Sequence, residues 1–203
     1  MKKYFIVAGE PSGDLHGGKL IKAIKGLNPN SSFMGHGGDS MRNEGMHIIE
    51  HVDNLSIMGF AEVLRHLPRM NKIMRSTVGA IERSKPDRVI LIDYPGFNLR
   101  LAKRLSPLKI PITYFILPQA WAWKQGRVEV LKRFIDQSIS IFPFENDWYK
   151  RRGLGVEYFG HPFVDIEHFN ETTKSFYKRH SLNINNPILT LLPGSRQQEV
   201  DRH

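Results

Sequence analysis

Two apolar stretches of the chain run directly into residues that can do chemistry, and the first lies near the N-terminus. Tyr4–Ala8 is followed by Gly9–Asp14, a turn of small residues that carries the carboxylates of Glu10 and Asp14 and the hydroxyl of Ser12. Small residues let the backbone reverse tightly at the carboxyl end of a buried strand and leave N–H groups facing a ligand. We therefore expect a ligand-binding edge here, with Asp14 placed to cap the helix that follows.

The second stretch, Arg88–Ile92, is the most strand-like run of the sequence, and Asp93 follows it immediately. Open α/β sheets bind ligands in the crevice beyond the carboxyl ends of their strands, so a carboxylate there can act as a general base. An Asp that caps the next helix or pairs with a nearby Arg explains the pattern equally well. Asn98 is divided in the same way between capping a helix and donating to a ligand.

A third group of candidate residues follows the apolar stretch Ile112–Ile116. The loop Pro118–Lys124 holds Gln119 and two tryptophans, Trp121 and Trp123. Packing in a core is the more frequent fate of tryptophan, but an indole face and its N–H group also suit contact with a sugar or an acyl chain. The loop is therefore predicted to act as a lid, a sugar contact or part of the core.

These stretches belong to a regular alternation of strand-like and helix-like segments. We predict strands at residues 3–8, 32–34, 46–49, 88–92, 112–116, 138–142, 156–159 and 188–192, and helices at about 14–26, 58–83, 98–106, 126–135 and 145–152. Such alternation predicts an α/β fold with a Rossmann-like parallel sheet and helices on both faces. Right-handed crossovers then place the loops that follow the strands along one rim.

Composition limits the classes to which the chain can belong. The absence of cysteine excludes a disulfide framework and fits a reducing compartment. No run approaches the ~20 apolar residues of a membrane span, and the run after Met1–Lys3 is shorter than the roughly 7 residues that a signal peptide needs. We therefore interpret the chain as cytoplasmic. Its 29 Lys and Arg against 20 Asp and Glu give a formal charge of +9, which favours anionic partners such as phosphorylated substrates, acidic lipids or nucleic acid.

The segment Leu55–Arg75 is both basic and amphipathic. Such a segment can lie in a bilayer interface with its arginines at anionic headgroups. An ordinary crossover helix with a solvated basic face is the more frequent origin of the pattern. Pro68 predicts a kink or a break in either case.

Two motif matches indicate other functions but lack the structural context that these functions require. Gly13–Leu20 reads G-x-x-x-x-G-K-L, yet Leu20 replaces the Ser or Thr that a P-loop phosphotransferase uses to bind its metal, and Asp14 would lie in the phosphate cradle. His47–His51 matches the zinc signature H-x-x-E-H, which works on a helix, whereas its two isoleucines favour a strand.

The regular alternation breaks at Asn183–Pro187, which is typical of a linker. Beyond it, Ile188–Leu192 is predicted to be a new strand and Pro193–Arg196 a second turn from strand to helix. We therefore predict an N-terminal domain over residues 1–182. Residues 183–203 are predicted to be a linker and the first strand and turn of a truncated second domain.

Several short motifs, in this order and spacing, resemble those of the lipid-A-disaccharide synthases. They are Gly9–Asp14, Ser56–Gly59 with Glu62–Val63, Ile92–Asn98, Trp121–Trp123, Pro143–Glu145, Gly160–Pro162 and Leu191–Arg196. Each motif is weak alone, but together they extend over nearly the whole chain. Gly96 departs from the family, in which an acidic residue is frequent at this position, and this indicates that the position is not itself essential.

The resemblance implies the acceptor-binding N-terminal half of an inverting GT-B glycosyltransferase whose donor-binding domain is truncated. Enzymes of this family join UDP-2,3-diacylglucosamine to 2,3-diacylglucosamine 1-phosphate and release UDP and the β-1,6-linked disaccharide 1-phosphate of lipid A biosynthesis. The resemblance implies no cofactor, no metal, no nucleic-acid partner, and a peripheral location on the cytoplasmic face of the inner membrane. The fragment alone is expected to be inactive. A P-loop-like phosphotransferase and a non-catalytic domain that binds anionic lipid or nucleic acid are the alternatives.

The resemblance also assigns roles to residues. Asp93 is predicted to be the base that accepts the proton of the acceptor 6-hydroxyl, with Glu10 the less favoured candidate. Substrate binding is assigned to Ser12, Gly13, Asp14, Asn98, Gln119 and Trp121. The donor phosphates are assigned to a helix N-terminus and its guanidinium, at Gly194, Ser195 and Arg196. Because diacylated substrates lie in a membrane surface, membrane contact is assigned to Phe60, Leu64, Leu67, Arg65 and Arg69.

Overall fold

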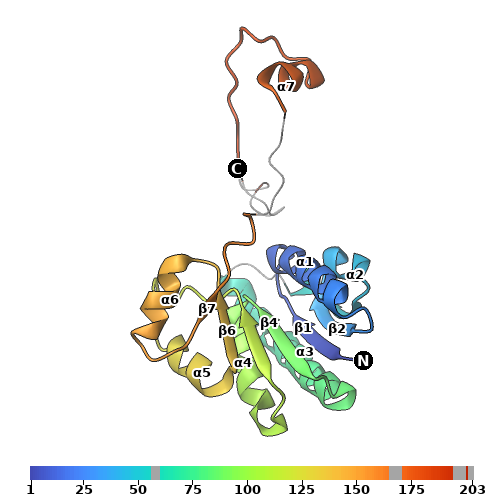
Figure 1. Ribbon diagram of the computed structural model, residues 1–203, viewed down its shortest axis with the longest axis vertical. Coiled ribbons are helices and arrows are strands. Elements are labelled where there is room, and N and C mark those ends of the chain that lie inside the picture. Colours follow the sequence, from blue (N-terminus) through green and yellow to red (C-terminus); the bar gives the residue numbers. More distant parts are fainter. Residues whose placement is uncertain (56–59, 165–170, 194–199, 201–203) are drawn as a thin grey trace. The chain divides into compact units, whose positions relative to one another are not determined.

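A single parallel sheet forms the centre of the fold. The computed structural model describes residues 1–55, 60–164, 171–193 and 200, with residues 60–67 described by their backbone alone. The sheet has seven strands in the order β3-β2-β1-β4-β5-β6-β7 (Figure 1), and all neighbours pair in parallel. The strands are β1 Lys3–Val7, β2 Ser32–Gly37, β3 His47–His51, β4 Arg88–Ile92, β5 Ile112–Phe115, β6 Gln137–Ser140 and β7 Glu157–Tyr158. The predicted α/β class is confirmed.

Helices connect the strands. They are α1 Pro11–Leu27, α2 Asp39–Asn43, α3 Phe60–Ser84, α4 Pro95–Leu105, α5 Arg127–Phe134, α6 Pro143–Lys150 and α7 Thr173–Arg179, with single 3-10 turns at η1 Val52–Asn54 and η2 Ser106–Leu108. The five predicted helices are all present. Short α2 and α7 were not predicted, and α1, α4 and α6 begin earlier than predicted, each at a proline.

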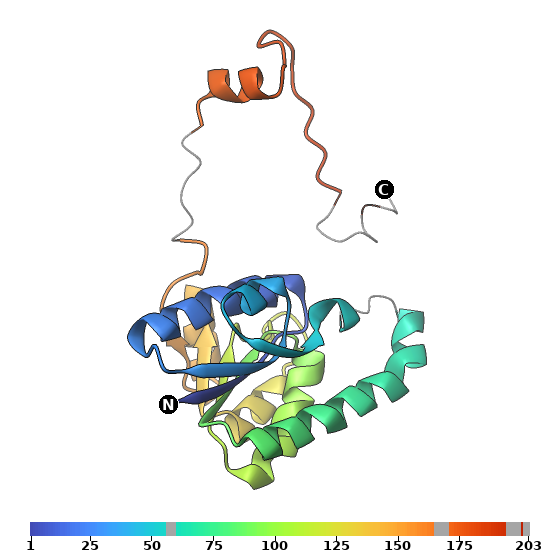
Figure 2. The ribbon, with the colours of Figure 1, turned by 90° about the vertical axis from the view of Figure 1, so that its right-hand side faces the viewer.

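The sheet is buried on both faces, as the alternation of side chains along β1 demonstrates. Phe5 and Val7 join one core cluster, whereas Ile6 and Ala8 join another on the opposite face. Figure 2 shows α1 and α2 along one face of the sheet and α3, α4 and α5 along the other. The prediction of helices on both faces is therefore confirmed.

Strand order changes direction between β1 and β4, which are neighbours in the sheet although far apart in the sequence. Val7 near the end of β1 lies beside Leu91 in β4. A crevice forms at such a switch point because the connections on its two sides leave the sheet in opposite directions. The loops after β1 and β4 therefore flank the position at which open α/β sheets bind ligands.

The basic amphipathic segment forms most of α3. Pro68 lies inside this helix, so a break at the proline is not observed, and Figure 2 shows the helix changing direction toward its N-terminal end. Arg69 is exposed, while the side chains of Phe60, Leu64, Arg65 and Leu67 lie outside the described residues. In the described part of the chain, no helix has the length and apolar character to cross a membrane.

The chain divides into two units, Met1–Val164 and Asp165–His203. The first unit ends before the predicted boundary at 182/183, and the assignment of the two parts to acceptor and donor binding stays a prediction. The strand predicted at Ile188–Leu192 is wrong. Those residues have no regular secondary structure and Leu189 is 85% exposed, because no described strand lies beside them to supply hydrogen bonds.

The two competing motifs lie in secondary structure that does not suit them. Gly13–Leu20 lies wholly within α1, so its backbone forms helix rather than the loop that cradles a phosphate. His47–His51 forms β3, which confirms the predicted strand. Among the residues that the structure describes, no group of three or more His, Asp or Glu side chains is arranged to hold a metal ion.

Candidate active site

Two carboxylates meet at the switch point of the sheet. Glu10 directly precedes α1 and Asp93 directly follows β4. The pKa of Asp93 is raised to about 6, first by burial and second by the negative charge of Glu10, against smaller opposing effects of the Tyr94 backbone N–H and Arg127. Asp93 therefore holds a proton more tightly than an ordinary aspartate, which suits a group that exchanges protons near neutral pH.

Asp93 neither caps α4 nor forms an ion pair among the described residues. The N-cap of α4 is Tyr94 rather than Asp93. No arginine or lysine among the described residues forms an ion pair with the Asp93 carboxylate. The positive charge of Arg127 nonetheless acts to lower the pKa of Asp93, and the role of Asp93 as base stays a prediction.

The backbone at Asp93 is strained. Asp93 and Tyr94 have φ angles of 43° and 47°, a left-handed conformation that side-chain-bearing residues seldom adopt. Strain of this kind persists only where the surroundings hold it, and it is concentrated at functional sites. Two side chains bind the Asp93 carbonyl oxygen: Asn98 Nδ2 donates to it at 2.8 Å and the Tyr114 hydroxyl donates at 2.6 Å.

Asn98 is a brace for this turn. It is fully buried inside α4, which begins at Pro95, so the predicted N-cap role is wrong. Its Nδ2 also lies 3.2 Å from the Ile92 carbonyl oxygen and 3.4 Å from that of Val7, which ties the ends of β4 and β1 together. The assignment of Asn98 to substrate stays a prediction, and these contacts give it a structural function.

Gly9 makes room for the same turn from the side of β1. A Cβ atom at residue 9 would lie 2.2 Å from Cδ1 of Tyr94, so the Tyr94 ring packs directly over the glycine. The Tyr94 hydroxyl donates to the Leu55 carbonyl oxygen at 3.2 Å. The glycine predicted to allow a tight turn thus also permits contact between the loops after β1 and β4.

A cavity of about 180 Å³ opens beside Asp93. Gln119 lines it, so two of the predicted site residues are brought together, and Trp123 and Arg127 line it as well. The Arg127 guanidinium lies over the Trp123 ring, with Cζ 4.5 Å from the ring centroid. The cavity therefore combines a proton acceptor, an amide, a cation and an aromatic face.

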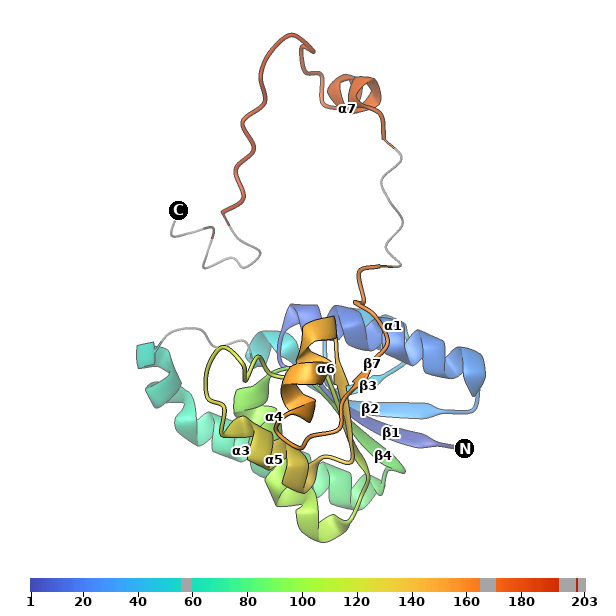
Figure 3. The same cartoon turned by 60° about the vertical axis from the view of Figure 1, so that its left-hand side comes forward.

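Trp121 serves the cavity indirectly. Its Nε1 donates to Oε1 of Glu145 at 3.0 Å, and its ring meets Phe144 edge to face at 5.2 Å between centroids. The Tyr149 hydroxyl donates to the carbonyl oxygen of Pro118. Helix α6, which carries Glu145 and Tyr149, thus fastens the loop between β5 and α5 (Figure 3). The Trp121 side chain is used by this anchor, and its assignment to substrate stays a prediction.

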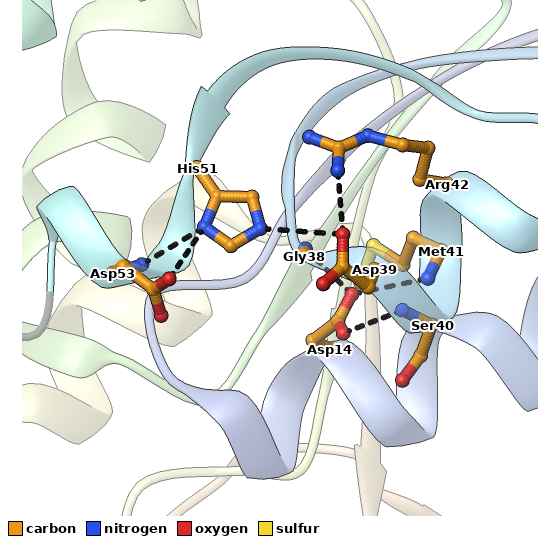
Figure 4. Close-up of polar contacts among 8 residues, drawn as sticks. All are labelled: Asp14, Gly38, Asp39, Ser40, Met41, Arg42, His51 and Asp53. Atoms are coloured by element: carbon orange, nitrogen blue, oxygen red, sulfur yellow. Dashed lines mark hydrogen bonds and ion pairs between the residues drawn. The ribbon is translucent and has the colours of Figure 1, made fainter.

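The carboxylate of Asp14 is occupied by backbone groups. Asp14 accepts N–H groups of Gly38 at 2.6 Å, Ser40 at 2.9 Å and Met41 at 3.1 Å (Figure 4). It lies inside α1 and caps α2, so the prediction that it caps its own helix is wrong. Asp14 is only 5% exposed, and these hydrogen bonds replace those that its carboxylate would form with water.

The structure gives less information on the other residues predicted to bind substrate. Gly13 is buried, and a Cβ atom at this residue would lie 3.2 Å from that of Ala8, so it keeps α1 close to β1. Ser12 is exposed in the first turn of α1. The donor-phosphate residues Gly194, Ser195 and Arg196 lie outside the described residues.

Comparison with known proteins identifies the family. Residues 4–203 match the family model described as Lipid-A-disaccharide synthetase. The chain belongs to this family. A lipid-A-disaccharide synthase of Myxococcus xanthus is 40% identical over 200 residues, which are 98% of this chain and 52% of the relative. The chain spans about half the length of the curated relatives it matches.

Solved structures with little sequence similarity share the fold. MnaA of S. aureus, in a structure with UDP, superposes with a TM-score of 0.63 at 14% identity and covers 89% of this chain and 52% of its own. MurG of Acinetobacter baumannii superposes with a TM-score of 0.52 at 12% identity, over 83% of this chain and 48% of its own. The chain therefore has the fold of one half of a GT-B protein, as predicted.

In this lipid-A-disaccharide synthetase family member, sequence reasoning missed Arg127 and selected Trp121 rather than Trp123 for the site. Two tryptophans two positions apart in a loop do not indicate which of them faces a cavity. Arg127 begins α5, and its position in the sequence a few residues after Trp123 was the available signal. Only the fold of the loop brings Arg127 to the cavity that Asp93 lines.

Proposed function

We propose that this protein joins UDP-2,3-diacylglucosamine to 2,3-diacylglucosamine 1-phosphate, as a lipid-A-disaccharide synthase, and that the described domain binds the acceptor sugar. The observation that carries the proposal is the position of Asp93 beside Glu10 at the switch point of the sheet, in a chain of this family. A GT-B half with a desolvated carboxylate in its crevice suits proton abstraction from a sugar hydroxyl.

In the proposed reaction, Asp93 accepts the proton of the acceptor 6-hydroxyl. With its pKa near 6, Asp93 is about nine-tenths ionised at pH 7 and so is ready to act as base. The acceptor oxygen forms a bond to the anomeric carbon of the donor as the bond to UDP breaks, and UDP leaves with the electron pair. Attack from the face opposite to UDP inverts that carbon and gives the β-1,6 linkage.

The other assignments complete the proposal. Ser12, Gly13, Asp14, Asn98, Gln119 and Trp121 remain the proposed acceptor contacts, with Gln119 best supported because it lines the cavity beside Asp93. Donor phosphates are assigned to the backbone N–H groups at Gly194 and Ser195 and to the Arg196 guanidinium.

Membrane contact is assigned to α3, whose Arg69 is exposed, and the proposed location is the cytoplasmic face of the inner membrane. Phe60, Leu64, Arg65 and Leu67 complete the proposed contact. Replacing Phe60, Leu64 and Leu67 with polar residues should then weaken binding to anionic vesicles without unfolding the protein. Unchanged vesicle binding would assign these residues to the core.

Mass spectrometry of the product tests the function. The full-length protein, given both diacylated sugars, should form tetraacyl disaccharide 1-phosphate, and Asp93→Ala should form almost none. The 203-residue chain alone should also be inactive, because the proposed donor site requires more than this chain. Product from Asp93→Ala would leave the activity standing and remove Asp93 as base. The absence of product from the full-length protein would overturn the proposed function.

The alternative of a P-loop-like phosphotransferase has little support. The residues that would form its phosphate loop lie in α1, and Lys19 is exposed on that helix. ATP-dependent thermal stabilisation that disappears in Lys19→Ala would restore the alternative. A non-catalytic domain would instead bind anionic lipid or nucleic acid in a salt-sensitive manner that survives the loss of Asp93.

A further inference from the structure

Arg127 presents a cation to the cavity beside Asp93, whose carboxylate it attracts without forming an ion pair. The side chain is half-buried and belongs to no ion pair among the described residues. No described carboxylate accepts a hydrogen bond from its guanidinium, although Asp93 lines the same cavity. A half-buried guanidinium that forms no ion pair retains the capacity to bind an anion, and its planar fork of donors matches the oxygens of a phosphate.

The ring of Trp123 contacts a second cation, Lys124, in addition to Arg127. The Nζ atom of Lys124 lies 4.6 Å from the centroid of the Trp123 ring, and Cζ of Arg127 lies 4.5 Å from it. The ring is 54% exposed, which is a large apolar surface to leave beside water unless it has another duty. The indole therefore contacts two cations, and both the ring and Arg127 line the cavity.

Arg133, the other arginine of α5 that stacks on an aromatic ring, provides a comparison for Arg127. Arg133 lies over Phe134 with Cζ 5.3 Å from the ring centroid, at the end of α5 remote from Arg127. It lines a different hollow, which it shares with Asp136 at the amino ends of β5 and β6. Arg127 differs because its cavity also contains the proposed base.

Charge balance in the cavity favours an anionic ligand that carries hydroxyl groups. Asp93 lines the cavity and the negative charge of Glu10 acts on it, so a hydroxyl can donate to a carboxylate there. Arg127 lines the same cavity, and Lys124 adds a second positive charge through its contact with the Trp123 ring. A phosphomonoester carries a charge of roughly −1.5 to −2 at neutral pH, so two cations balance it.

We propose that Arg127 and Lys124 bind the phosphate of a sugar phosphate whose hydroxyl lies at Asp93, with Trp123 holding the two cations in place. This inference rests on the proposed function and adds to it a recognition site for the phosphate of the acceptor. The cavity of about 180 Å³ is small, so it takes the phosphate and part of the sugar ring, and the rest of the ligand extends out of it.

Calorimetric titration of the full-length protein tests the site with three water-soluble probes: glucosamine 1-phosphate, glucosamine and inorganic phosphate. The wild-type protein should bind glucosamine 1-phosphate at least about tenfold more tightly than either of the others, since a charge-assisted pair contributes on the order of one to two factors of ten. Arg127→Ala should remove that preference, and Arg127→Lys should restore part of it.

Arg133→Ala is the matched control, because it removes an arginine stacked on a ring of the same helix. It should bind all three probes like the wild type. A preference for glucosamine 1-phosphate that survives in Arg127→Ala would overturn the proposal. Equal, Arg127-dependent affinity for inorganic phosphate would overturn the sugar part of it.

The proposed function and this site fail in different experiments. If no disaccharide forms but Arg127 still discriminates the sugar phosphate from glucosamine, the phosphate site stands and the reaction does not. If disaccharide forms at wild-type rate in Arg127→Ala, and glucosamine competes as well as glucosamine 1-phosphate, the reaction stands and the phosphate site does not.

Discussion

Asp14 and Asp93 both lie just beyond the carboxyl end of a central strand, yet their carboxylates meet opposite surroundings. Asp14 accepts three backbone N–H groups and fastens α2 to α1. Asp93 is buried near the charge of Glu10 on a strained backbone, and it lines a cavity. Burial of a carboxylate is therefore a poor sign of chemistry by itself, whereas a raised pKa beside a cavity favours a functional role for Asp93.

The largest effect that would sharpen this comparison is on folding. Asp14→Ala should lower the free energy of unfolding by about 3 kcal/mol, because buried N–H groups lose a charged acceptor. Urea denaturation of the 203-residue chain measures it. Asp39→Ala is the control, since Asp39 lies in the same cluster but is exposed and pairs with Arg42 (Figure 4), and it should change stability by less than about 0.5 kcal/mol. Equal losses of unfolding free energy in the two variants would show that the hydrogen bonds of Asp14 contribute no more than an exposed ion pair.

Asp93 should behave in the opposite way. Its folded pKa of about 6 exceeds the unfolded value, so the folded state binds more protons between about pH 4 and 6, and stability falls as pH rises through that window. Asp93→Asn has no such penalty and should be more stable than the wild type by roughly 2 kcal/mol at pH 8. The difference should vanish near pH 4. Urea denaturation at both pH values measures it, and an Asn variant that is less stable at pH 8 would contradict the prediction.

Glu10 tests the electrostatic part of the comparison. Because its charge is the second cause of the raised Asp93 pKa, after burial, Glu10→Gln should lower that pKa and move the acidic limb of the pH–rate profile to lower pH. The shift should be less than about one pH unit, since burial remains. Glu129→Gln, an exposed glutamate of α5, should leave the profile in place. An unmoved limb in Glu10→Gln would separate Glu10 from Asp93.

The smallest effect concerns the anchor of the loop that lines the cavity. Trp121→Phe keeps an aromatic ring beside Phe144 but removes the N–H that binds Glu145. We expect kcat/KM to fall severalfold, because the variant loses the free energy of about one hydrogen bond. Trp148→Phe in α6 removes an indole N–H for which no described acceptor exists, and it should have little effect. Losses in Trp121→Phe and Glu145→Gln should combine less than additively in the double variant. Full additivity would show that the two side chains act separately.

Much of the fold was predictable from strand patterns, while the ends of helices were not. Helices α1, α4 and α6 begin at Pro11, Pro95 and Pro143, earlier than their apolar periodicity indicated. Proline fits the first helical position because its missing N–H would have no partner there. The signal was present, but apolar spacing outweighed it in the prediction.

The site was predictable where one strand end determines a position. Asp93 and Glu10 follow apolar strands, and parallel pairing of β1 and β4 brings their loops together. Arg127 and Trp123 were not found because the path of their loop depends on Glu145 and other tertiary contacts. Periodicity cannot report such contacts, and for the same reason it did not reveal that Asn98 braces a turn.

The contact between Gly9 and Tyr94 limits how the sequence of this protein can diverge in evolution. Any side chain at residue 9 would enter the space of the Tyr94 ring, since even a Cβ atom would lie 2.2 Å from it. A substitution of Gly9 therefore has to be matched by a smaller residue at position 94. In diverging descendants of this chain, a larger residue 9 is expected to appear together with a smaller residue 94.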